Sequence, residues 1–134
     1  MACHALLKLA SNPQHAEEIV QHGGIGAVLH LMHHSPFCAT VQPVACQALK
    51  ELSEEHHERI GAEDGLMRIV YALRHLDPSE DAALDALNQL LGANANNRDR
   101  FRNGPGQILN RNDRITARKL KGRKHLRDAM QQIE

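Results

Sequence analysis

The 134-residue sequence predicts one all-α domain built from a repeated helical unit. Apolar residues make up 42% of the chain and aromatic residues only 2%, so the core must consist mainly of Leu, Ile, Val and Ala. Such a core favours helices over a β-sandwich or barrel. Apolar residues also recur with helical spacing, and related segments return about every forty residues.

Two kinds of landmark indicate the repeat. Residues 3–9 (CHALLKL) match residues 46–52 (CQALKEL) at an offset of 43, and the second segment matches residues 85–90 (DALNQL) at an offset of 38. A glycine recurs at a constant offset of 41: Gly24, Gly65 and Gly106. Variable offsets between fixed landmarks are typical of a repeated unit with loops of different length.

Each unit is expected to contain a short helix, a glycine turn, a middle helix, a loop and a longer helix. Asn12 and Pro13 are suited to begin the first short helix, because Asn caps a helix and Pro fits its first turn. The short helices carry a few apolar anchors: Ala16, Ile19, Val20, Ile60 and Phe101. The middle helices are predicted from two apolar stripes: Ile25, Val28, Leu29 and Met32, then Leu66, Ile69, Val70 and Leu73.

The longer helices carry apolar stripes of the same period. Their members are Ala2, Ala5, Leu6 and Leu9, then Val41, Val44, Ala45, Ala48, Leu49 and Leu52, then Ala83, Ala86, Leu87 and Leu90. Asp77 and Pro78 are suited to begin the last of these helices. We assign two full repeats and two partial ones, over residues 1–11, 12–53, 54–92 and 93–106.

Residues 12–31 (NPQHAEEIVQHGGIGAVLHL) followed by 41–52 (VQPVACQALKEL) resemble the armadillo repeat, a three-helix unit of about 42 residues. Residues 53–90 resemble a weaker second copy, and HEAT-type repeats are the nearest competing family. The resemblance implies a right-handed α-solenoid whose long helices line a concave groove for extended peptides or partner proteins.

In the importin and catenin branches of this family, the groove presents a Trp and an Asn one turn apart. The corresponding residues here are His4, Gln47 and Asp85 at the Trp positions, and Lys8, Glu51 and Gln89 at the Asn positions. We therefore do not expect importin-like recognition of basic peptides. Together with Lys50 and Asn88, these six residues are the expected lining of a partner-binding groove; the alternative is a solvated helix face.

Two full repeats make a thin array, because each unit buries its apolar stripe against a neighbour and at least three are usually needed. The chain is therefore expected to be a fragment of a longer repeat protein. Self-association through exposed repeat ends is the alternative.

The formal net charge of zero hides an uneven distribution. Residues 1–97 carry five basic and twelve acidic side chains, a net −7, whereas residues 98–134 carry eleven basic and four acidic ones, a net +7. The segment 107–134 lies outside the repeat frame, and residues 113–133 are compatible with a helix that presents Leu126, Met130 and Ile133 on one face.

Several interpretations of this basic segment stay open. One interpretation is that it caps the end of the array, and another is that it docks on the acidic body, residues 1–97, or on a second copy. The others are that it serves as a nuclear import signal or that it binds a polyanion such as nucleic acid or anionic lipid. The residues that would bind a polyanion are Arg118, Lys119, Lys121, Arg123, Lys124 and Arg127.

The sequence contains no motif that predicts catalysis. Residues 23–26 (GGIG) lack the preceding strand and the spacing of a dinucleotide-binding loop. His30 and His34 share a helix face, but no complete metal-binding motif accompanies them, and Cys46 is expected in the core. We therefore expect no enzyme, no cofactor and no metal, but a protein–protein interaction scaffold, with polyanion binding as the alternative.

The sequence also bears on cellular location. No apolar run approaches the roughly 20 residues of a membrane-spanning helix, and residues 1–10 lack the features of a signal peptide. Three widely spaced Cys, an odd number, indicate a reducing compartment. A cytoplasmic location is expected, and the basic run at 118–124 leaves a nuclear one open.

Overall fold

The computed structural model describes residues 13–36, 38–75, 80–110 and 119–133. These ranges contain eight α-helices and no strand, which confirms the all-α prediction. The helices are α2 (Pro13–Gln21), α3 (Gly24–His34), α4 (Val41–Ala62), α5 (Gly65–His75), α6 (Glu80–Ala93), α7 (Ala95–Arg102), α8 (Pro105–Asn110) and α9 (Lys124–Gln131).

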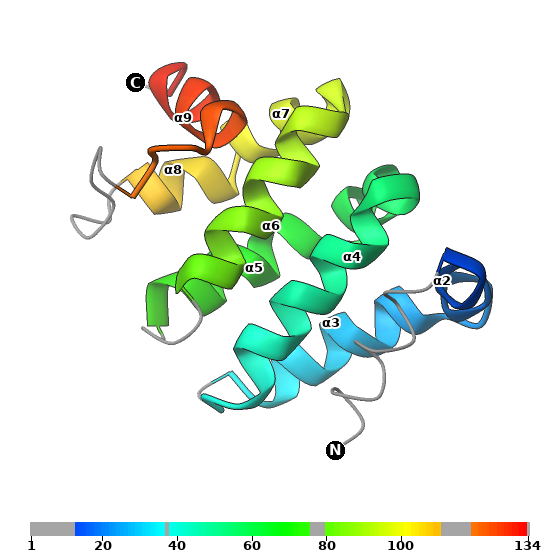
Figure 1. The fold of residues 1–134 in the computed structure, drawn as a ribbon. Helices are drawn as coiled ribbons and strands as arrows, with labels where there is room; N and C mark the ends of the chain where they lie inside the picture. The colour runs from blue at the N-terminus through cyan, green and yellow to red at the C-terminus, as the bar shows by residue number, and fades with distance from the viewer. Residues whose placement is uncertain (1–12, 37, 76–79, 111–118, 134) are drawn as a thin grey trace.

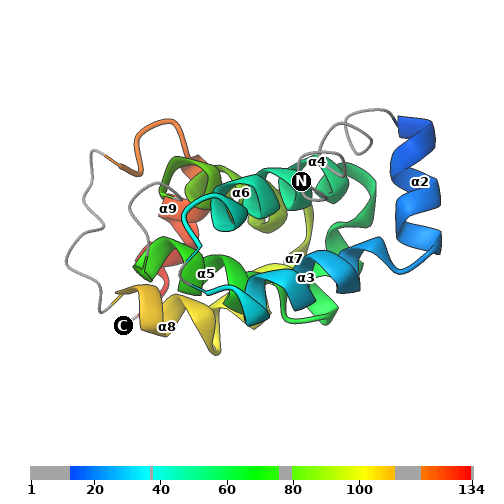
Figure 2. The ribbon, with the colours of Figure 1, turned by 90° about the horizontal axis from the view of Figure 1, so that it is seen from below.

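The helices are arranged in rows. Figure 1 shows α4, α6 and α9 side by side, and α6 contacts both of the others. Figure 2 shows α3, α5 and α8 in a second layer, in which α5 contacts both α3 and α8. The C-terminal helix therefore extends the row of long helices rather than projecting away from the body.

The predicted apolar stripes form the core. Within the described ranges, every stripe residue of α3, α4, α5 and α6 is buried except Val44, which is half-buried. The anchors Ile60 and Phe101 are completely buried, as is Leu126 of α9. Burial of one such side chain stabilises a fold by about 1.5–3 kcal/mol, so these stripes account for much of the packing. The predicted helix at 2–10 and the helix start at Asp77 and Pro78 lie outside the described residues.

The three recurring glycines share one packing arrangement. A Cβ atom added at any of them would clash with the side chain and the carbonyl oxygen of the residue five positions earlier, and these pairs are Gly24 with Ile19, Gly65 with Ile60, and Gly106 with Phe101. Each middle helix thus begins directly against the end of a short helix, where only glycine allows the backbones so close. Because glycine and anchor both recur at an offset of 41, the repeat is visible in the structure as well as in the sequence.

The first two turns share a further feature. The residue before the glycine, Gly23 or Asp64, has a positive φ of 79° or 67°. Asp is among the few non-glycine residues that adopt this left-handed conformation readily. At the third turn the corresponding residue is Pro105, whose ring holds φ negative, so the backbone enters α8 differently.

α4 contains two of the predicted helices, joined at a kink. His56 has φ −119° and ψ 24°, outside the helical region, and residues 57–62 after it carry the anchor Ile60 of the second short helix. The predicted repeat boundary between residues 53 and 54 is therefore not a loop. No Gly or Pro separates Ser53 from Ile60, so the backbone continues as a helix and changes direction at one residue.

The C-terminal segment is less helical than the sequence suggests. Of the helix expected over 113–133, the described residues 119–133 contain only α9, because residues 119–122 form turns and Gly122 has a φ of 80°. Glycine adopts this left-handed conformation without strain, and it interrupts the helix. Residues 113–118 are not among the described ones, and α8 runs across the expected boundary between residues 106 and 107.

Candidate functional site

The predicted groove residues lie on the adjacent helices α4 and α6. On α4, Gln47 is exposed, whereas Lys50 and Glu51 are half-buried. On α6, the half-buried members are Asp85, Asn88 and Gln89. His4 and Lys8 fall outside the described ranges. The structure thus brings six of the eight predicted residues onto two neighbouring helices.

Gln89 holds these two helices together. Its Nε2 donates hydrogen bonds to the carbonyl oxygen of Lys50 at 3.0 Å and to Oγ of Ser53 at 2.7 Å. Ser53 is completely buried, and its hydroxyl donates in turn to the Lys50 carbonyl at 2.6 Å. Both amide protons of Gln89 are therefore used within the fold. This residue, expected to face a ligand, instead positions α6 against α4.

The chain's own C-terminal segment covers Asp85 and Asn88. Nε of Arg123 donates to Oδ1 of Asp85 at 2.8 Å, and its NH2 lies 3.5 Å from Oδ1 of Asp81. The backbone N–H of Leu126 donates to Oδ1 of Asn88 at 3.1 Å. That N–H belongs to the first turn of α9, where it has no partner within the helix. The α6 end of the predicted groove is therefore occupied.

The basic segment meets acidic residues of α6. Lys119 Nζ lies 2.9 Å from Oε2 of Glu80, and Arg123 pairs with Asp85 as described. Of the other predicted polyanion-binding residues, Arg118 is outside the described part, whereas Lys121, Lys124 and Arg127 are exposed. Since Leu126 is also buried in the core, this segment packs along α6 and docks on its acidic side. Docking on the acidic body was one of the interpretations that the sequence left open for this basic segment.

Within the described residues, the α4 end of the predicted groove is open. The side chains of Gln47, Lys50 and Glu51 make no hydrogen bond or ion pair with other described residues. Lys50 and Glu51 are adjacent and of opposite charge. This surface therefore presents a hydrogen-bonding amide, one cation and one anion on a helix that is hydrogen-bonded to Gln89 of α6.

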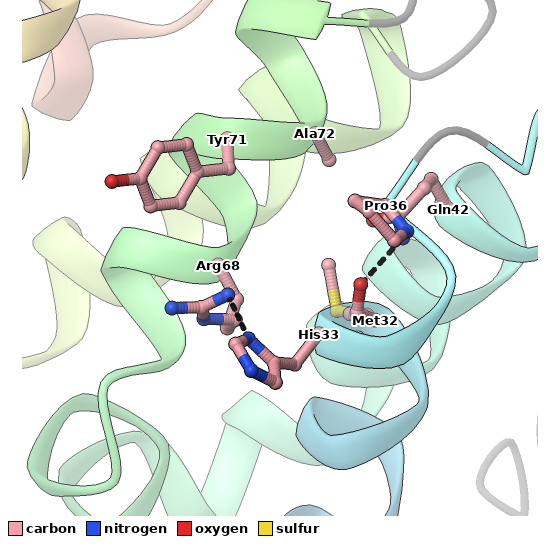
Figure 3. Close-up of a pocket in the computed structure, with 7 residues that line it drawn as sticks. All are labelled: Met32, His33, Pro36, Gln42, Arg68, Tyr71 and Ala72. Carbon is pink, nitrogen blue, oxygen red and sulfur yellow. Dashed lines mark hydrogen bonds between the residues drawn. The ribbon is translucent and has the colours of Figure 1, made fainter.

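A cavity between α3 and α5 was not foreseen in the sequence (Figure 3). Its volume is about 310 Å³, and it is lined by Met32, His33, Pro36, Gln42, Arg68, Tyr71 and Ala72. NH1 of Arg68 lies 2.8 Å from Nδ1 of His33, and the guanidinium carbon lies 5.3 Å from the centroid of the Tyr71 ring. The one sequence feature that could have indicated this cavity is Tyr71, the only Tyr of the chain, which lies on the polar face of α5.

A second unforeseen cluster joins α2 to the kink of α4. Glu17, Glu55 and His56 place their potential ligand atoms within 4.8 Å of one another. His56 Nε2 is buried and lies 3.2 Å from Oε2 of Glu17, although the geometry is not that of a hydrogen bond. Both carboxylates are exposed, and exposed acidic groups commonly lie together without an ion. Glu17 is far from His56 in the sequence, so no spacing rule could have connected them.

The remaining histidine pair and cysteine lie on α3 and α4. His30 and His34 are both exposed, with ring centroids 4.1 Å apart, whereas Cys46 is completely buried, as expected for a core residue. Glu58 accepts hydrogen bonds from NH2 of Arg100 and Nδ2 of Asn94, both at 2.6 Å. The Arg100 hydrogen bond, followed by that from Asn94, lowers the pKa of Glu58 to about 2. These contacts link the second short helix to α7.

Among the described helices, none combines the length and apolar character needed to span a membrane. No protein-family model, curated protein or solved structure matches this chain in the comparisons made. A functional conclusion therefore depends on the surfaces described above.

Proposed function

We propose that this chain is a non-enzymatic protein–protein interaction scaffold, an armadillo-type right-handed solenoid that holds a partner segment against its long helices. The observation that supports this most directly is the open surface of Gln47, Lys50 and Glu51 beside the contact between α4 and α6. Polar side chains that face away from the core on a rigid helix pair suit recognition of an extended segment.

The repeat geometry supports the solenoid part of the proposal. The glycine turns recur with the same packing at a constant offset, and the long helices and middle helices form two separate rows. Stacked units of this kind leave one row of helices available for a partner. In this arrangement α9 stands in the place of the third long helix.

The charges of the open surface suggest the character of the partner segment. Lys50 and Glu51 have opposite charges, and the neighbouring part of α6 is already covered by Arg123 and Leu126. A segment with an acidic and a basic residue in complementary order would therefore pair with α4. Such exposed pairs contribute mainly to specificity and the rate of association.

The experiment is affinity capture with the isolated chain and a charge-swapped variant, K50E/E51K, which keeps the net charge. A matched control is R59E/E63R, which reverses an exposed i,i+4 ion pair between Arg59 of α4 and Glu63, the residue that follows this helix. We expect K50E/E51K to lose a specific partner that the wild type and the control retain. Equal capture by all three proteins would place the partner elsewhere.

The alternative function is binding of nucleic acid or another polyanion. It is favoured by the exposure of Lys121, Lys124 and Arg127, whereas Lys119 and Arg123 already pair with carboxylates. If this function applies, K121Q/K124Q/R127Q must elute from heparin at lower salt than the wild type, because each phosphate or sulfate contact releases counterions. Identical elution of wild type and variant would exclude the alternative.

A further inference from the structure

We propose that the cavity between α3 and α5 is a second docking site, and that it binds an acidic segment of a partner protein. One apolar side chain of that segment enters between Met32 and Tyr71, and a neighbouring Asp or Glu carboxylate pairs with Arg68 (Figure 3). This site is separate from the open surface of α4.

The apolar wall of the cavity has the size of one side chain. Met32 and Ala72 form buried parts of it, at 3% and 2% exposed, and Pro36 closes one end. The volume of about 310 Å³ lies near the lower limit of pockets that bind ligands, roughly 300 Å³. It therefore suits a single anchoring residue rather than a large ligand.

The rim has the composition of a binding hot spot. Tyr71 is 37% exposed, the one large apolar side chain that is exposed in the described part of the chain. Arg68 lies beside its ring, with the guanidinium carbon 5.3 Å from the centroid. Tyr and Arg are enriched among interface residues that dominate binding energy, because they combine apolar area with directed hydrogen bonds.

The charge of the cavity determines which segment fits. Arg68 is half-buried, and among the described residues its side chain is hydrogen-bonded only to His33. No carboxylate of the described residues lines the cavity. Several other arginines of the described chain pair with carboxylates, as Arg100 does with Glu58 and Arg123 with Asp85.

Two other polar groups of the cavity, the Gln42 amide and Nδ1 of His33, are already used within the fold. Gln42 Nε2 donates to the carbonyl oxygens of Met32 at 3.0 Å and Ser35 at 2.8 Å. His33 accepts from Arg68 through Nδ1, because a guanidinium can only donate. The remaining donors of Arg68 match the two oxygens of a carboxylate. An anionic group beside an apolar one is therefore the complementary ligand.

Arg68 is one of few cations in this part of the chain. Residues 1–97 carry five basic and twelve acidic side chains, so an acidic segment finds few other basic side chains there to pair with. A small molecule in so shallow a site would gain few contacts. A polypeptide segment adds backbone contacts outside the cavity, which favours a protein partner.

The test is titration of the full ¹⁵N-labelled chain with three blocked tripeptides, followed by NMR. Acetyl-Glu-Phe-Glu-amide carries both groups, acetyl-Gln-Phe-Gln-amide lacks the carboxylates, and acetyl-Glu-Ala-Glu-amide lacks the apolar anchor. We expect the first peptide to bind at least threefold more tightly than either of the others. Its chemical-shift changes should centre on Met32, His33, Arg68, Tyr71 and Ala72.

Variants then assign the carboxylate contact. R68Q should abolish the difference between the Glu and Gln peptides, whereas R74Q, which removes an exposed cation of α5 outside the cavity, should preserve it. The peptide comparison on the wild type remains decisive even if R68Q does not fold. K50E/E51K should bind these peptides normally, so this proposal and the α4 proposal fail independently.

Three results would overturn the proposal. One is equal affinity of the wild type for the three peptides. Another is a set of shift changes centred on Lys121, Lys124 and Arg127, which would indicate simple attraction of acidic peptides to the basic segment. The last is equal loss in R68Q and R74Q.

Discussion

Arg123 and Asp85 form an ion pair, Nε to Oδ1, of 2.8 Å that joins the basic C-terminal segment to α6. The Arg123 side chain is only 17% exposed, and its NH1 also donates to the carbonyl oxygen of Lys119 at 2.7 Å. One guanidinium thus fixes both the turn before α9 and the position of that turn on α6. This contact explains why the segment with most of the positive charge lies against acidic residues.

The Arg123–Asp85 pair should contribute measurably to stability. In a double-mutant cycle with R123Q and D85N, we expect a coupling free energy of about 1 kcal/mol, at the upper end for pairs near a surface because Arg123 is largely buried. Urea unfolding of the four proteins measures it. The control cycle is R127Q with D128N, an exposed pair 4.0 Å apart, for which we expect no measurable coupling. Equal coupling in both cycles would contradict this prediction.

Leu126 should be essential for the packing of α9. It is completely buried, so L126A leaves a cavity and should lower the free energy of unfolding by about 3 kcal/mol. M130A removes a half-buried side chain of the same helix and should cost clearly less. Thermal and urea unfolding followed by circular dichroism compare the two. Near-identical stability of L126A and the wild type would mean that α9 does not cap the core.

The recurring glycines should tolerate no side chain. G65A forces a Cβ against the side chain and carbonyl oxygen of Ile60, so we expect a loss of about 1–3 kcal/mol. G104A is the matched control, because its Cβ would meet Arg100 and Met67 only at ordinary contact distances, 3.8 and 4.0 Å. The control should lie within about 0.5 kcal/mol of the wild type. A G65A protein as stable as G104A would show that the close approach is not required.

Glu58 should contribute to the free energy of unfolding at neutral pH and lose this contribution at acid pH. Hydrogen bonds from Arg100 and then Asn94 lower its pKa from 4.5 to about 2 in the folded chain. The unfolded chain therefore takes up a proton at higher pH than the folded one, and the stabilisation is fully present above pH 4.5 and lost as pH falls toward 2.

The measurement is the melting temperature of the wild type and E58Q at several pH values. The difference between them should be largest above pH 4.5 and should shrink as pH approaches 2. E54Q removes an exposed carboxylate that has no ion pair within the described residues, and it serves as the control. A constant difference between the wild type and E58Q across this range would mean that Glu58 titrates normally.

Local chemistry predicted much of this fold. The apolar stripes predicted which faces of α3 to α6 lie in the core, because residues about 3.6 positions apart lie on the same face of a helix. The spacing of Gly24, Gly65 and Gly106 located three turns with the same close contact, since a missing side chain there permits an approach that any Cβ would block. Pro13 also begins α2, as expected of proline in a first turn.

Other features had no local signal. No residue between 53 and 60 predicts the kink at His56, because this segment contains neither Gly nor Pro. Similarly, the helix expected before residue 124 is interrupted at Gly122, a residue that a helical pattern alone does not exclude. The cavity beside Tyr71 combines residues of α3 and α5 with the start of α4, and no single segment contains its pattern.

By itself, the sequence determined the helical class, the residues of the core and the repeat of the turns, because periodicity and glycine act over neighbouring residues. Only the tertiary structure decided which polar side chains remain available. Gln89 and Asp85 occupy equivalent-looking surface positions, yet one bonds to α4 and the other to Arg123, 38 residues away. Which partner a polar side chain finds depends on which helices become neighbours. A contact between segments that are distant in the sequence produces no periodic pattern of residues, so the sequence does not reveal it.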